Sequence, residues 1–154
     1  MTRKIKKNYI YNGLGFPVCL KEVEMTEVLG EWAPKINVKK IASMAIKKLA
    51  LQEEKLTGNQ VKFIRGYFSM SLREFGNTIV KQTHSAVRKW ESFKDHPTSM
   101  DENTEDILKL YITDKLSLIK NPDKFRKQCQ KLIKNRLKKI ENPVITINQY
   151  LTVW

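Results

Sequence analysis

The chain has 154 residues and a formal net charge of +13 at neutral pH. This length can bury one sizeable core with a smaller appendage, and this charge attracts polyanions: nucleic acid first, an anionic membrane second, an acidic protein third. Cys19 and Cys129 lie far apart without a second cysteine near either, which argues against a structural zinc site. No signal peptide and no membrane-spanning apolar run is evident, so we expect a cytoplasmic protein with no membrane contact.

The N-terminal part combines a basic arm, short strand patterns and a helix. Residues 1–7 are basic and contain little that would order them. Two β-like runs, residues 9–11 and 16–20, flank the turn signal of residues 12–15 and predict a small hairpin or a three-stranded sheet. Residues 37–55 carry apolar side chains at helical spacing, which predicts a helix that packs on the core.

The next stretch, residues 56–93, is predicted to form three short helices. The first two each begin with a capping box, in which a hydroxyl caps the helix and a side chain three residues later reaches back. The third begins at a threonine cap and runs through Trp90. The predicted caps are Thr57 with Gln60, Ser71 with Glu74, and Thr83.

The predicted third helix has two different faces. Val87 and Trp90 share the face that we expect to be buried. The other face is polar and partly basic, and a short helix of this kind can enter the major groove of DNA. The alternative is a solvated polar face without a partner. The polar residues are His84, Ser85, Arg88 and Lys89.

Residues 56–93 resemble the Cro/cI (XRE) helix-turn-helix family. The resemblance is carried by Arg65, by the opening Met-Ser-x-x-Glu-Phe-Gly at residues 70–76, and by Thr-His-Ser-Ala-Val-Arg-Lys-Trp-Glu at residues 83–91. It implies a recognition helix from Thr83 to Trp90. Three departures are Leu72 where the family often has Gln, Gly76 where it usually has Ala, and a turn at residues 80–82 that is one residue longer than the common form.

The resemblance also implies roles for individual side chains. An ion pair between Arg65 and Glu91 would tie the first helix to the end of the third. Basic residues on the flanks would bind phosphates, and polar residues of the recognition helix would read bases. The expected phosphate contacts are Arg73, Lys81, Lys89 and Lys94, and the expected base contacts are Gln82, Thr83, His84, Ser85 and Arg88.

The remainder of the chain is predicted to hold two more helices and a strand. Residues 104–118 form the first helix, and in the resembled family such a helix often lies at a dimer interface. From Lys120 to Lys139 there are nine basic residues and one acid, which fits a phosphate-facing surface, an acidic partner or a solvated face. Residues 144–154 look extended, and we expect them to pair with the hairpin or with a second protomer.

A second resemblance concerns the hairpin. A Gly-x-Gly-Phe-Pro hairpin at residues 13–17, followed by Leu-Thr-Gly-x-Gln at residues 56–60, is similar to antitoxin-type regulators of the HigA and MqsA kind. The zinc-binding cysteines of the MqsA type are absent from this sequence. The resemblance implies that the hairpin binds a partner or forms a dimer; the alternative is a structural cap on the helical core.

Together these patterns predict a mainly α protein of the α+β type. We expect a lambda-repressor-like helix-turn-helix bundle, with a small N-terminal β-hairpin region and a C-terminal basic helix plus strand. The expected parts are residues 1–55, 56–120 and 121–154. No Gly-rich phosphate loop, metal-ligand spacing or nucleophile–base pairing emerges, so we predict neither an enzyme nor a bound cofactor.

The predicted function is sequence-specific regulation of transcription. The protein would be a repressor that binds double-stranded DNA as a homodimer, with two recognition helices that read the half-sites of a palindrome. The alternative is an antitoxin that neutralises a cognate toxin protein and autoregulates its operon.

Overall fold

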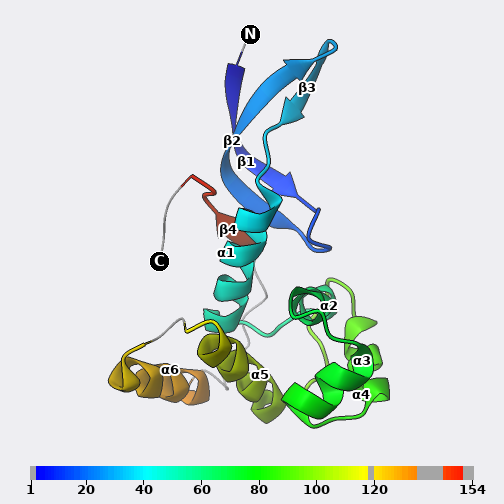
Figure 1. Ribbon diagram of the computed structural model, residues 1–154, viewed down its shortest axis with the longest axis vertical. Coiled ribbons are helices and arrows are strands. Elements are labelled where there is room, and N and C mark those ends of the chain that lie inside the picture. Colours follow the sequence, from blue (N-terminus) through cyan, green and yellow to red (C-terminus); the bar gives the residue numbers. More distant parts are fainter. Residues whose placement is uncertain (1–2, 118–119, 135–143, 151–154) are drawn as a thin grey trace. The chain divides into compact units, whose positions relative to one another are not determined.

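The computed structural model describes residues 3–117, 120–134 and 144–150 (Figure 1). Backbone contacts divide the chain into two compact units. We call them the sheet unit (Met1–Ala45 with Val144–Trp154) and the helical unit (Ile46–Pro143). Among the described residues, no helix is long and apolar enough to cross a membrane. The three-part division expected from the sequence stays a prediction.

The sheet unit is built on four strands: β1 (Arg3–Tyr11), β2 (Val18–Val28), β3 (Glu31–Pro34) and β4 (Ile145–Ile147). The central strand is β2, which pairs antiparallel with β1 along most of its length. Towards its C-terminal end it also pairs antiparallel with β3, and near its start it pairs parallel with β4 (Figure 1). The expected pairing of the C-terminal strand with the hairpin is therefore confirmed for β4, while residues 151–154 lie outside the described part.

The core of the sheet unit follows the alternation of side chains along β2. Val18 and Leu20 are buried at even positions, and Val23 and Met25 are buried at odd positions. Successive side chains of a strand point to opposite faces, so the covered face changes along β2. Helix α1 (Val38–Leu51) begins in this unit, where Ile41 and other residues of its apolar stripe are buried, and ends in the helical unit.

The basic arm expected to lack order is instead strand β1 from Arg3 onward, so that prediction was wrong. Pairing with β2 orders its backbone, and the side chains find partners across the sheet. Arg3 Nη1 lies 3.4 Å from a carboxylate oxygen of Glu24, and Lys4 Nζ lies 4.2 Å above the ring of Trp32. Exposed side-chain pairs of this kind contribute little to stability on their own. The backbone hydrogen bonds between β1 and β2 are therefore the main reason that β1 is ordered.

The expected mainly α helix-turn-helix bundle is also wrong. The protein is α+β, with six α-helices and a four-stranded mixed sheet in the described residues, and the N-terminal strands form most of that sheet. The sequence suggested only short strand runs, but β1 has 9 residues and β2 has 11. Nearly every residue of β1 is exposed, so its charged side chains hide the alternation that usually reveals a strand.

In addition to the end of α1, the described residues of the helical unit form five α-helices and one π-helical segment. Its core includes Val61 and Ile64 on the helix of residues 58–67, and Leu108 and Ile112 on the helix of residues 102–115. The predicted basic helix is present as far as Lys134, and residues 135–140 lie outside the described part. The elements are α2 (Gly58–Tyr67), α3 (Leu72–Phe75), the π-helix η1 (Gly76–Val80), α4 (His84–Glu91), α5 (Glu102–Lys115) and α6 (Pro122–Lys134).

Two charged side chains of α5 are buried and hold the segment that leads from α1 to α2. Lys109 is 2% exposed, and its Nζ donates to the carbonyl oxygens of Gln52 and Glu54 at 3.0 and 2.9 Å. Glu105 is 7% exposed, and its Oε1 accepts from the backbone N–H of Leu56 at 2.6 Å. Burial raises the pKa of Glu105 and lowers that of Lys109, although each charge partly offsets the shift of the other.

Replacing Lys109 with methionine should reduce the free energy of unfolding by about 3–5 kcal/mol, because Glu105 would keep a buried charge without its cation. Two carbonyl oxygens would also lose their donor. Urea unfolding measures the loss, and Lys115→Met on the exposed side of the same helix is the matched control. The double variant Glu105→Gln/Lys109→Met should recover part of the loss; equal stability of wild type and Lys109→Met would refute the structural role.

The raised pKa of Glu105 predicts a pH dependence. A carboxyl group whose folded pKa exceeds its unfolded value stabilises the fold below the unfolded pKa, and this contribution is lost as the pH rises through the folded pKa. The free energy of unfolding of the wild type, relative to that of Glu105→Gln, should therefore fall as the pH rises from the unfolded to the folded pKa of Glu105, and level off above it. Urea unfolding of both proteins at a series of pH values tests it; a parallel pair of curves would contradict the assignment.

Candidate nucleic-acid interface

The first helix of the site, α2, begins with the predicted capping box. Gln60 N–H donates to Thr57 Oγ1 at 3.2 Å, and Thr57 N–H donates to Gln60 Oε1 at 3.0 Å. Both side chains are buried, at 6% and 4% exposure. A reciprocal box gives hydrogen-bond partners to two backbone N–H groups that would otherwise be buried without one, so it fixes where α2 starts.

The start of α2 lies directly against the end of α4. A Cβ atom at Gly58 would lie 2.5 Å from the carbonyl oxygen of Trp90 and 2.7 Å from the amide nitrogen of Lys94. Asn59 N–H donates to the carbonyl oxygen of Lys94 at 2.8 Å. Only a glycine permits this approach of two backbones, and the contact places the C-terminal end of α4.

An ion pair holds α2 and α4 together further along. Arg65 Nε donates to one carboxylate oxygen of Glu91 at 2.7 Å, and Arg65 Nη2 donates to the other at 2.9 Å. Arg65 Nη1 also donates to the carbonyl oxygen of Met70 at 3.1 Å. The hydrogen bond to Glu91 raises the pKa of Arg65. The structure thus brings together the two residues for which the resemblance implied an ion pair, and it adds the loop before α3 to that connection.

The element before α4 changes its helical type part-way. Ser71 caps α3 by accepting from the N–H of Glu74 at 3.1 Å, and after Phe75 the chain continues as the π-helix η1. A π-helical turn takes one residue more than an α-helical one, which accommodates the longer connection seen in the sequence. Lys81 then adopts a left-handed conformation (φ 54°), and the N–H of Gln82 donates to the carbonyl oxygen of Gly76 at 3.0 Å.

Helix α4 presents the polar face expected from its sequence. Its predicted cap is confirmed, since Ala86 N–H donates to Thr83 Oγ1 at 3.2 Å. Val87 and Trp90 are buried, at 0% and 6% exposure. The residues proposed to read bases are exposed: Gln82, Thr83, His84, Ser85 and Arg88.

The residues proposed to bind phosphates are exposed as well, but they come from different elements. Arg73 lies on α3, Lys89 lies on α4, and Lys94 follows α4. Lys81 lies in the connection and its Nζ donates to the carbonyl oxygen of Asn77 at 3.0 Å. Helix α4 itself has a single carboxylate, that of Glu91, and Arg65 binds it. The exposed face of α4 therefore carries positive charge without a competing acid of its own.

The described residues contain no group of three or more His, Cys, Asp or Glu side chains that could hold a metal ion. Comparisons with protein-family models, with characterised proteins and with solved structures found no match. The resemblance to the Cro/cI family therefore stays a prediction from residues 56–93.

Gly76→Ala should destabilise the helical unit by about 1–3 kcal/mol, because the new methyl group would lie 2.4 Å from the carbonyl oxygen of Gln82. The matched control is Gly66→Ala within α2, where a Cβ meets nothing within 4 Å. That change should stabilise the protein by up to about 1 kcal/mol through helix propensity. Urea unfolding distinguishes the two, and an equal effect of both substitutions would contradict the close approach at Gly76.

Proposed function

We propose that the protein is a transcriptional regulator, a repressor, that binds double-stranded DNA with the exposed face of α4. One observation carries the proposal: α4 is held rigidly on its apolar side while its other side is polar, basic and exposed. Rigid elements place base-reading groups more precisely than loops do. Two copies that act as a homodimer would read two half-sites about one helical turn apart.

The chemistry of the exposed face suits base edges in the major groove. Arg88 can donate in bidentate fashion to O6 and N7 of guanine, and the amide of Gln82 can pair with N6 and N7 of adenine. His84 and Ser85 add groups that both donate and accept hydrogen bonds. Gln82 and Arg88 lie at opposite ends of the face, so their contacts would extend over more than one base pair.

The surrounding cations supply affinity that does not depend on sequence. Each of Arg73, Lys81, Lys89 and Lys94 that neutralises a phosphate releases a condensed counterion, which makes binding weaker as the salt concentration rises. The chain charge of +13 adds long-range attraction to any polyanion. A duplex of B-form DNA is favoured over double-stranded RNA because the major groove of A-form RNA is too narrow and deep for a helix to read.

Arg88→Ala should reduce the affinity for the preferred duplex by about 1–3 kcal/mol and the affinity for random DNA by much less, since it would remove a base contact. The preferred duplex is found first by selection from a random library. Lys89→Ala should weaken binding equally on both duplexes and reduce the salt slope by about one. Fluorescence anisotropy measures all of these affinities.

The control is Lys115→Ala on α5, which removes one exposed positive charge outside the proposed site. It should leave the ratio of specific to random binding unchanged. Equal losses on both duplexes for Arg88→Ala would mean that this residue contacts only phosphate. Failure of the library to yield any preferred duplex would overturn the proposed function.

A further inference from the structure

The turn between β2 and β3 exposes an apolar side chain in an unfavourable backbone conformation. Leu29 and Gly30 join the two strands, and both have positive φ angles, 52° and 83°. Hairpin turns of this kind normally carry Asn, Asp or Gly, because a larger side chain is strained there. Leu29 is also 100% exposed and its neighbour Val28 is 55% exposed. Neither the strain nor the exposure benefits an isolated chain.

Carboxylates border this apolar turn on both strands. Glu27 and Glu31 are exposed, and Glu31 lies directly across from Val28 in the register. Within the described residues neither carboxylate forms an ion pair, whereas Glu24 further down β2 pairs with Arg3. We call the segment from Glu27 to Glu31 the acidic tip.

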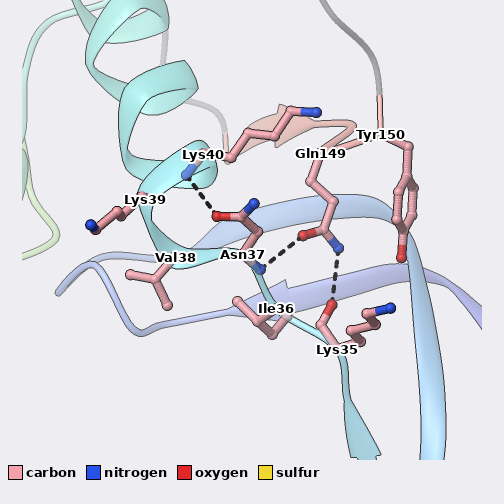
Figure 2. Close-up of a pocket in the computed structure, with 8 residues that line it drawn as sticks. All are labelled: Lys35, Ile36, Asn37, Val38, Lys39, Lys40, Gln149 and Tyr150. Carbon is pink, nitrogen blue, oxygen red and sulfur yellow. Dashed lines mark hydrogen bonds between the residues drawn. The ribbon is translucent and has the colours of Figure 1, made fainter.

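The same unit contains a pocket with the opposite charge. It has a volume of about 600 Å³ and lies where β3 leads into α1 (Figure 2). Ile36, Val38 and Tyr150 give it apolar surface, and the last two are 51% and 50% exposed. Its basic residues are Lys35, Lys39 and Lys40, and within the described residues none of them forms an ion pair.

The backbone around this lysine pocket is well fixed. Gln149 is 4% exposed; its Oε1 accepts from Asn37 N–H at 3.2 Å, and its Nε2 donates to the carbonyl oxygen of Lys35 at 3.3 Å. Asn37 in turn accepts from Lys40 N–H at 3.2 Å (Figure 2). The pocket is thus formed before any partner binds, which limits the entropy that binding costs.

We propose that the acidic tip of one copy of this chain docks in the lysine pocket of a second copy. Leu29 would cover the apolar surface of Ile36, Val38 and Tyr150, while the tip carboxylates would face the lysines. In the part of the chain that the structure describes, both surfaces carry charge of opposite sign without an ion-pair partner, and every copy supplies both surfaces. A two-fold arrangement uses each tip and each pocket once and forms a closed dimer.

A chain cannot make this contact with itself. Only Trp32 to Pro34 of strand β3 lie between Glu31, the last residue of the tip, and Lys35. The extended path from Glu31 to Lys35 spans about 13 Å, so the tip and the pocket lie at opposite ends of β3. The proposal concerns the sheet unit alone and does not rest on the binding of DNA by α4.

The test is sedimentation velocity of the full chain without nucleic acid. The protein concentration should cover about a hundredfold range centred on a micromolar dissociation constant, which is typical of small interfaces. The wild type should shift from monomer to dimer. Leu29→Asn should weaken the association by about tenfold or more, since it removes the apolar side chain. It should not harm the fold, because asparagine favours this turn; circular dichroism and a urea midpoint confirm that.

The control is Ile107→Gln, which replaces another exposed apolar residue, 52% exposed on α5. It should leave the dimer unchanged. A wild type that stays monomeric throughout the range would overturn the proposal. A dimer that Ile107→Gln weakens and Leu29→Asn does not would also overturn it, because the contact would then lie on α5.

Charge exchange gives the sharper test. A tip variant, Glu27→Lys/Glu31→Lys, and a pocket variant, Lys35→Glu/Lys39→Glu, should each stay monomeric because like charges would meet. A mixture of the two should associate again, since lysine tips would face glutamate pockets in one direction and glutamate tips would face lysine pockets in the other. Failure of the mixture to associate, with both variants folded, would overturn the pairing of these two surfaces.

Discussion

The candidate interface depends on the ion pair between Arg65 and Glu91. Both Arg65–Glu91 hydrogen bonds are short, and the third guanidinium donor reaches the carbonyl oxygen of Met70, so one side chain connects α2, the following loop and α4. The pair is only partly exposed, with side-chain exposures of 20% and 11%, so water screens it less than a surface pair. It also removes the single carboxylate of α4 from the exposed face. The contact that positions the helix therefore also determines its charge.

The rest of the helical unit supports this pair through a series of contacts that involve backbone atoms. Lys109 and Glu105 of α5 hold residues 52–56, which lead into the capping box of α2. The start of α2 then meets the end of α4 at Gly58. Because these contacts position α4 largely through backbone groups, the exposed side chains of α4 are not needed for the stability of the helical unit. A site can change its polar residues freely when the scaffold does not depend on them.

The parts of this structure that depend on neighbours in sequence could be predicted, and those that depend on distant partners could not. The caps at Thr57, Ser71 and Thr83 need only a backbone donor three residues away, and all three caps are present. The sheet was underestimated because β1 is ordered by its pairing with β2. Glu105 and Lys109 share helical spacing with the buried Leu108 and Ile112 and are buried with them, which the sequence pattern did not predict because both side chains are charged. Their partners are carbonyl and amide groups about fifty residues away, and no local pattern indicates those.

The placement of acids matters more than their number in a chain with a charge of +13. Glu91 is bound by Arg65, Glu105 is buried, and Glu24 pairs with Arg3, so none of these carboxylates is free to repel a polyanion or to attract a cation. The carboxylates of the acidic tip are exposed beside a strained Leu29. A strained, solvated apolar residue is retained only where something offsets its cost, and a contact that buries it does so. The lysine pocket offers such a contact, because its cations stabilise the same carboxylates that would repel DNA.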